Sequence, residues 1–257
     1  DKIRDLTDKQ KAIMDNAIER VESILLSRYA IANAAKSTYI MQHWGDNFSS
    51  FNTHATAWWQ PYGEFGTTTR KDNDAYFKAI ASTTEGKQAN FEYVFENNVA
   101  GTDNATSMYL EYTINLKDVA GTHKDFTDGT FYRFANKIYT SIEDILKAYE
   151  NQSNPFGTDT KDVLLAELKI VDGKTTATEA ELAKFRTDHA IEIFVGGKAY
   201  YKTTIDDKFL SYTGRHLIQR NSVYQLNIKN VYNVGADVPN GDPTTVDPMY
   251  YLNVEVT

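Results

Sequence analysis

The most regular alternation of hydrophobic and polar residues lies between residues 108 and 116. Apolar side chains occupy every second position there: Met108, Leu110, Tyr112, Ile114 and Leu116. Because successive side chains of a β-strand point to opposite faces, this pattern predicts a strand whose apolar face is turned toward a core. The intervening residues are expected to face outward: Tyr109, Glu111, Thr113 and Asn115.

Other segments have the same two-residue period or follow a turn signal. Asp128 and Gly129 favour a turn into a second candidate strand over residues 131–139. Strand character returns at residues 222–234. It returns again at residues 250–256, where apolar and polar positions alternate. These segments predict further strands of an antiparallel sheet.

A hairpin is predicted around two consecutive glycines. Residues 190–195 carry apolar side chains at alternate positions and read as a strand. Gly196 and Gly197 then favour a tight turn, because glycine adopts the backbone conformations that hairpin turns require. We therefore expect residues 198–203 to return as the hairpin partner of residues 190–195.

The first segment of the chain carries a helix signal. Thr7 with Gln10 three residues later resembles a capping box, and apolar residues follow at helical spacing. We expect this helix to end near residues 20–23. Residues 24–41 are rich in Ile, Leu, Tyr and Ala, and suit either a long helix or a pair of strands.

Two further helices are predicted later in the chain. Ser141 with Asp144 caps a short helix whose apolar residues share one face. A second short helix is expected over residues 178–186, while residues 161–171 are ambiguous. Several strands with short helices between them, and no alternation of strand and helix, predict a mainly β protein with an antiparallel β-sandwich.

Length and composition are those of a soluble globular protein. A chain of 257 residues allows one large β domain or two smaller ones. We expect a helical segment over residues 1–20 and a β-sandwich domain over residues 21–257. The 17 Tyr and 13 Phe favour half-buried pleated surfaces, which supports the β assignment.

Charge and cysteine content exclude several classes of function. The net charge of −8 and the lack of a basic cluster argue against a nucleic acid partner. The chain has no Cys, which excludes disulfide bonds, thiolate metal sites and Cys nucleophiles. No segment approaches the run of about 20 apolar residues that crosses a membrane as a helix.

The sequence carries no local signature of catalysis or of a metal site. The five histidines are scattered, and no nucleophile elbow or phosphate-binding loop is present. We therefore expect no enzymatic activity, no metal and no cofactor. Asp237, Asn240, Asp242 and Asp247 offer oxygen ligands, but their spacing does not match a calcium-binding loop, and solvated acidic turns have this composition more often.

Two groups of residues are candidate binding elements. Trp58, Trp59 and Tyr62 form an aromatic group that covers the edge of a core or, alternatively, provides a ligand platform. The last strand has an apolar face formed by Tyr250, Leu252, Val254 and Val256. It either pairs within the chain as an ordinary final strand or pairs with a neighbouring molecule, since unpaired strands invite strand addition.

The C-terminal half of the chain resembles a known family. The resemblance rests on residues 193–205 with the pattern G-K-x-Y-Y, on residues 219–228 with the pattern R-N-x-x-Y-x-L-x-I, and on the closing strand at residues 252–256. These segments are similar to the C-terminal domain of the fimbrillins of Bacteroidales, most of all to the minor-fimbria type. Residues 131–149 and 29–40 resemble that family more loosely, and favour strands over a helix in residues 24–41.

The resemblance implies a transthyretin-like β-sandwich and a structural role in a pilus. It implies lipoprotein export, location in a fimbrium at the bacterial outer membrane, and polymerisation by donor-strand exchange. The partners it implies are identical subunits, accessory fimbrial subunits, and host or bacterial surface proteins. The alternative within this family is a tip or accessory adhesin. The family's N-terminal domain is not matched, so we expect the chain to be the C-terminal part of a longer protein.

Overall fold

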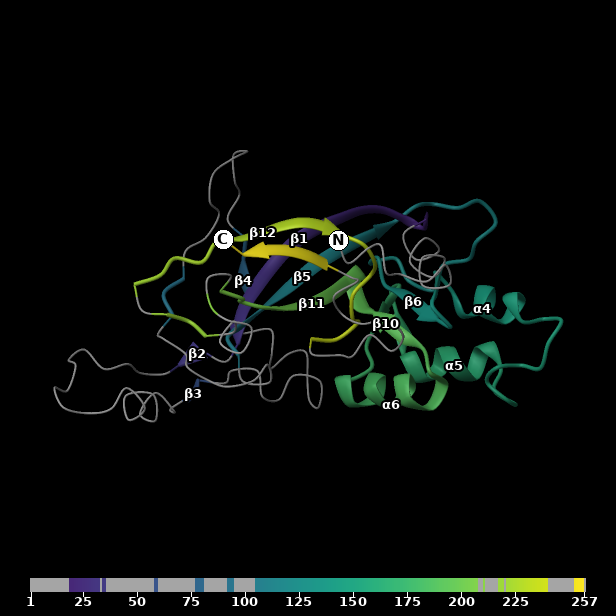
Figure 1. Ribbon diagram of the computed structural model, residues 1–257. Coiled ribbons are helices and arrows are strands. Elements are labelled where there is room, and N and C mark those ends of the chain that lie inside the picture. The colour runs from purple at the N-terminus through teal and green to yellow at the C-terminus, as the bar shows by residue number, and fades with distance from the viewer. Residues whose placement is uncertain are drawn as a thin grey trace.

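The computed structural model describes residues 19–32, 34–35, 58–59, 77–80, 92–94, 105–207, 210, 217–219, 221–239 and 252–256. Over these residues the protein is mainly β, with antiparallel sheets and three short α-helices (Figure 1). Most of the predicted first helix lies outside the described residues. Glu19 is helical and a strand begins at Val21, so the strand alternative is correct for residues 24–32 and 34–35, the part of residues 24–41 that the structure describes.

The largest sheet has the strand order β11-β5-β1-β4, and each neighbouring pair is antiparallel. Its members are β1 (Val21–Ala32), β4 (Lys78–Ala79), β5 (Ser107–Leu116) and β11 (Lys198–Thr204). One face of this sheet forms a hydrophobic core that includes Leu110, Tyr112 and Ile114. The predicted strand over residues 108–116 and its inward face are therefore confirmed.

The opposite face of β5 differs from the prediction. Tyr109 and Glu111 were expected to face outward, but both are buried. Tyr109 packs in a second apolar cluster with Ala30, Phe77 and Tyr200. The two-residue period identifies two faces of a strand, but a polar residue on one face does not establish that the face meets water.

The chain between β5 and β11, residues 117–197, forms a region that we call the lobe. β5 and β11 are antiparallel neighbours in the large sheet. The lobe therefore takes the place of the short loop that could connect two such strands. It contains a sheet of order β10-β6-β7 and the three helices, which lie to the right in Figure 1. The elements are β6 (Phe131–Phe134), β7 (Lys137–Tyr139), β8 (Ile170–Val171), β9 (Lys174–Thr175), β10 (Glu192–Phe194), α4 (Ile142–Ala148), α5 (Lys161–Leu168) and α6 (Glu179–His189).

Two strand predictions in this region are wrong in their pairing. Residues 131–139 form the hairpin β6-β7 instead of one strand, with Ala135 and Asn136 at positive φ in the turn. The predicted hairpin around Gly196 and Gly197 does not form, because β10 pairs with β6 while β11 pairs with β5. The two glycines instead carry the chain from one sheet into the other, within a short 3₁₀ turn.

The strands of the lobe contribute to two cores. Phe131, Ile138 and Phe194 pack with the apolar face of the large sheet. Their neighbours Tyr132, Tyr139 and Ile193 pack against the helices instead. This alternation follows from the strand geometry, and it explains why these strands are apolar on both faces.

The helices begin at the residues that the sequence indicates. Ser141 caps α4 by accepting a hydrogen bond from the backbone of Asp144, so this predicted helix is confirmed. The helix predicted over residues 178–186 is also confirmed as α6, with Thr178 and Glu181 forming a capping box. The ambiguous residues 161–171 form α5 followed by the short strand β8.

The remaining strands form two small sheets. β12 (Leu226–Val231) pairs with β13 (Leu252–Val256), and Ile228 and Val231 of β12 pack on the core of the large sheet. β2 (Ala34–Ala35) pairs with β3 (Trp58–Trp59). In Figure 1, β12 and β13 overlap β1 and β5, and the side chains of Ile228 and Val231 place β12 against the core on the apolar face of the large sheet.

Candidate functional site: the open edge of strand β1

In the part of the chain that the structure describes, one edge of strand β1 is only partly paired. Its other edge follows β5 from Val21 to Ala32. On the outer side, β4 pairs only with Arg28 and Tyr29, and the backbone of Ile80 donates a 3.1 Å hydrogen bond to the carbonyl of Ser27. Within the described part of the chain, no strand covers the outer edge of residues 21–26. We call these six residues the β1 open edge.

The apolar face beside the β1 open edge is incompletely covered. At the centre of the large sheet, Leu110 and Ile114 are almost fully buried. Toward the edge, Ile24 and Leu26 pack against the same core but remain partly exposed. An extended segment laid along β1 would complete the backbone hydrogen bonds and shield these two side chains, as in other cases of strand addition.

Two other edges of the described sheets are partly covered. The backbone of Asp125 donates a 3.1 Å hydrogen bond to the carbonyl of Thr140, directly after β7. Ala236 forms an antiparallel bridge with Tyr200 on the outer side of β11. Natural β proteins commonly protect their edges in this way. Compared with these two edges, the β1 open edge is the better candidate for pairing with another chain.

The predicted polymerisation residues lie mostly in β13. Leu252, Val254 and Val256 belong to this strand, whereas Tyr250 lies outside the described residues. β13 pairs with β12, with Val231 opposite Leu252. In this structure the last strand is therefore paired within the chain, as in the alternative of an ordinary final strand. Val256 is buried in a cluster with Ile205 and Ile218. A role of these residues in polymerisation stays a prediction.

The predicted aromatic platform is only partly described. Trp58 and Trp59 form β3 and pair with Ala35 and Ala34, and Tyr62 lies outside the described residues. A ligand role for these three residues stays a prediction. Of the candidate calcium ligands, only Asp237 is described. It is buried and forms an ion pair with Arg186.

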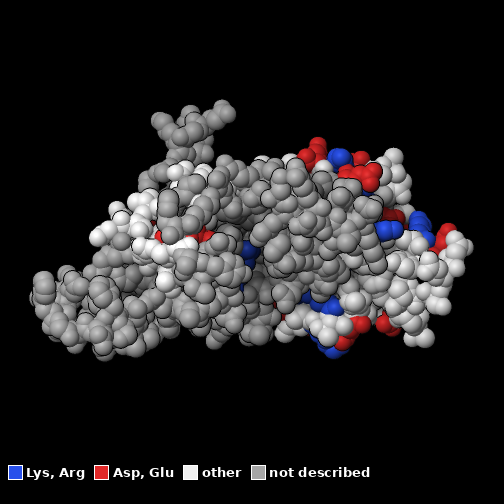
Figure 2. All heavy atoms as spheres, in the orientation of Figure 1, with Lys and Arg blue, Asp and Glu red and all other residues white. Residues whose placement is uncertain are grey.

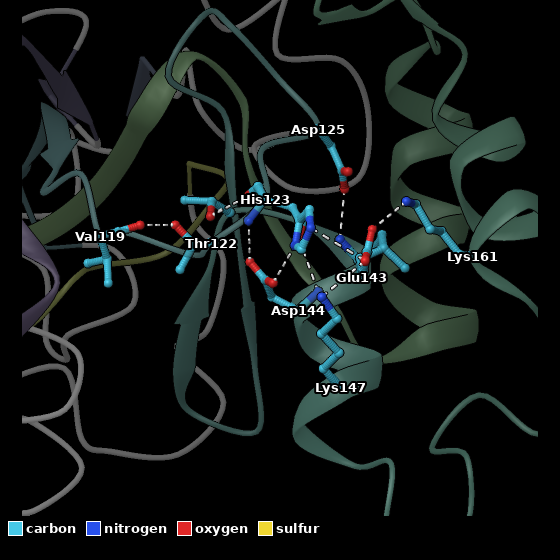
Figure 3. Close-up of polar contacts among 11 residues, drawn as sticks. Val119, Thr122, His123, Asp125, Glu143, Asp144, Lys147 and Lys161 are labelled. Atoms are coloured by element: carbon cyan, nitrogen blue, oxygen red, sulfur yellow. Dashed lines mark hydrogen bonds and ion pairs between the residues drawn. The ribbon is translucent and has the colours of Figure 1, made fainter.

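A polar cluster joins the first loop of the lobe to the start of α4 (Figure 3). His123 Nδ1 lies 3.0 Å from Asp144 Oδ1, and the backbone N–H of His123 donates to Asp144 Oδ2 at 2.9 Å. His123 Nε2 lies 3.5 Å from Glu143 Oε1. Lys161 and Lys147 approach the same Glu143 carboxylate at 2.7 and 3.1 Å.

The electrostatics of this cluster stabilise ionised carboxylates at its surface. Hydrogen bonds from Lys161 and Lys147 lower the pKa of Glu143 to about 2. Asp125 lies deeper and accepts hydrogen bonds from the backbone of Ile142 and from the Tyr132 hydroxyl. Burial raises the pKa of Asp125 and outweighs these hydrogen bonds.

These contacts hold the lobe together. Both imidazole nitrogens of His123 face carboxylates of α4, so the cluster ties the loop before β6 to the helix. His189 is arranged similarly, with Nε2 3.2 Å from both oxygens of Glu167 and its ring against Phe185. In the described part of the chain, no three His, Asp or Glu residues are placed to hold a metal ion. Sequence reasoning missed both pairings because the partners lie about twenty residues apart.

No protein-family model matches this chain, and no curated protein has a significant sequence match to it. Among the described helices, none has the length and apolar character needed to cross a membrane. Figure 2 shows Lys and Arg interspersed with Asp and Glu over the described surface of the face drawn. The functional proposal therefore rests mainly on the geometry of the β1 open edge.

Proposed function

We propose that this chain is a structural subunit of a surface filament of the fimbrillin kind, joined to its neighbours by strand addition. The β1 open edge is the observation that carries the proposal, because no strand in the described part of the chain pairs with its outer side and the apolar face beside it is only partly covered. The resemblance of residues 193–205 and 219–228 to fimbrillins supports it independently. The proposal includes a transthyretin-like sandwich, with β12 and β13 in the layer that faces the large sheet.

Strand addition at this edge is favourable on physical grounds. Backbone hydrogen bonds between the added segment and β1 would supply affinity that does not depend on side chains. Covering Ile24 and Leu26, which are already partly buried, would add about 1 kcal/mol each. Contacts of this head-to-tail kind join different surfaces of two copies, and they produce a filament when the rotation between copies does not close a ring.

The partners and location follow from this role. Identical subunits would form the shaft, accessory subunits would occupy its ends, and the filament would be anchored at the bacterial outer membrane. Host or bacterial surface proteins would be bound by the assembled filament. In the alternative, a tip or accessory adhesin, the chain would bind its ligand as a single subunit at the filament end.

Site-directed crosslinking tests the proposal, because the chain has no native Cys. Leu25 lies in the β1 open edge and is 58% exposed, and Val163 on α5 is 45% exposed. Each is replaced by Cys in the full-length protein, and a photoreactive maleimide is attached after purification. On assembly we expect the Leu25→Cys variant to crosslink to neighbouring subunits and the matched Val163→Cys variant to give little crosslinking.

The outcomes distinguish the two roles. A ladder of crosslinked species from position 25 supports shaft assembly through the β1 open edge. Full-length protein that never assembles, under any maturation treatment, contradicts the filament proposal and favours the adhesin. Assembly with equal crosslinking from both positions would mean that subunits meet elsewhere, and the β1 open edge would not be the docking site.

A further inference from the structure

Five buried residues between β12 and β13 form a segment that runs along the outer edges of β10 and β11. We call residues 233–237 the strap. Asn233, Val234, Ala236 and Asp237 each have less than 5% of their surface exposed. A loop segment that is this deeply buried needs internal partners for its backbone groups. The strap finds them in both the large sheet and the lobe.

On the side of the large sheet, the strap behaves as a short added strand. The backbone N–H of Tyr200 donates to the carbonyl of Ala236 at 2.8 Å, and the N–H of Ala236 returns a 2.9 Å bond to the carbonyl of Tyr200. The hydroxyl of Tyr201 donates to the carbonyl of Asn233 at 2.6 Å. Thus β11, the terminal strand of its sheet, receives an antiparallel partner.

On the side of the lobe, the strap covers the outer edge of β10. The backbone N–H of Ile193 donates to Asp237 Oδ2 at 2.9 Å, and Arg186 forms an ion pair with the same carboxylate. Arg133 Nη1 donates to the carbonyl of Val234 at 2.6 Å. The strap therefore contacts the lobe through one backbone carbonyl and one carboxylate.

Close approach of the strap depends on one glycine. A Cβ atom at Gly235 would lie 2.3 Å from the carbonyl oxygen of Tyr200 and 3.0 Å from the ring of Tyr201. The first distance is shorter than Cβ contacts found in proteins, and it involves a backbone atom, which cannot move aside cheaply; the second is a tight contact with a side chain. The edge therefore selects a segment with glycine two residues before an aspartate.

We propose that the edge formed by β10 and β11 is a second strand-accepting site, and that its occupant can be the strap of a second copy of this chain. The strap of a neighbour offers the same carbonyls, the same glycine and the same carboxylate. Exchange of one strap for another therefore replaces each contact by an identical one, which is the situation in which domain swapping costs little. This site is distinct from the β1 open edge and does not depend on it.

In a single molecule the site is closed by its own strap. The tethered segment competes at an effective concentration on the order of millimolar, so a free segment binds only when the resident strap is displaced. The consequence is that an isolated subunit presents this edge to a neighbour only after its strap is released. Two subunits that exchange straps would be joined through this edge, in addition to any contact through β1.

A peptide-binding experiment tests this inference. The probe is a fluorescent peptide of residues 231–239, and the receptor is the full chain with Gly235→Val, which excludes its own strap. We expect the variant to bind the peptide saturably and about tenfold or more tightly than the native chain, because the tethered competitor is removed. A peptide that itself carries Gly235→Val is the matched control and should not bind.

A second variant keeps the test informative if the first is too disruptive. Asp237→Asn weakens the contacts with Arg186 and Ile193 but leaves the backbone unchanged, so it should bind the peptide with intermediate affinity. A folded variant that binds the peptide no better than the native chain would overturn the inference. Failure of both variants to fold would also overturn it, since an edge that exists only with its own strap cannot be offered to a neighbour.

Discussion

At the scale of single residues, Gly197 is the position where backbone conformation matters most. It lies at φ 69°, in the left-handed region, and a Cβ atom there would meet the carbonyl oxygen of Ile114 at 2.6 Å. Gly196 has a similar φ of 61°, but open space lies where its Cβ would be. Comparing substitutions at the two glycines therefore distinguishes two effects on stability: the left-handed backbone conformation, which both positions have, and the steric clash, which only Gly197 has.

Replacing these glycines by alanine is expected to have unequal effects. Gly196→Ala should lower the free energy of unfolding by about 1 kcal/mol, because only the left-handed conformation is penalised. Gly197→Ala should cost about 3 kcal/mol, because the turn between β10 and β11 must also move away from β5. Urea denaturation of the two variants measures the difference. Equal losses would show that the collision at Gly197 is relieved without cost.

At the scale of elements, a buried carboxylate links three strands of the large sheet. Glu111 of β5 has no exposed side-chain surface, and receives 3.0 Å contacts from Arg28 on β1 and Lys198 on β11. Burial alone would raise the pKa of Glu111, but the hydrogen bonds from these two cations outweigh it and hold the pKa below the ordinary value of 4.5. The ionised form therefore stabilises the sheet.

This arrangement predicts a pH dependence of stability. Because the pKa of Glu111 is lower in the folded state, its contribution is complete above about pH 4.5 and is lost as the pH falls through the folded-state pKa. Glu111→Gln should lower the free energy of unfolding by about 2 kcal/mol at neutral pH, and the difference from the native chain should shrink in acid. Urea denaturation from neutral to acidic pH measures this, with the exposed Glu150→Gln as the control. A difference that stays constant with pH would contradict the prediction.

Local patterns predicted elements well and predicted pairing poorly. The alternation in β5 and the capping residues Ser141 and Thr178 are local signals, and the elements they predict are present. The glycine pair at residues 196–197 also signals a turn. It does not indicate that β11 must pair with β5, about eighty residues earlier in the chain, because that choice depends on where the whole lobe packs. The β1 open edge could not be predicted for the same reason. Whether an edge is open depends on where all the other strands of the described part of the chain lie, and local sequence patterns do not contain that information.

At the scale of the whole molecule, the large sheet and the lobe share structural elements. Phe131 of β6 is stacked on Phe194 of β10 within the core of the large sheet, with ring centroids 4.6 Å apart. The next residue, Tyr132, lies in the core under the helices. The strap adds contacts to both parts. The lobe is an insertion in sequence, yet its sheet serves as a wall of both cores.

This sharing predicts that the lobe and the large sheet unfold together. Phe131→Ala removes a buried ring from the core of the large sheet and should cost about 3–5 kcal/mol. Leu164→Ala on α5 lies in the other core, where it should cost about 2–5 kcal/mol. Both should shift one common urea transition, whether it is followed by far-UV circular dichroism or by the near-UV signal of the aromatic rings. If Leu164→Ala shifted only an early loss of helix and left a later transition in place, the lobe would be an independent unit. The strap would then be a segment that connects two independently folding units through its contacts with both.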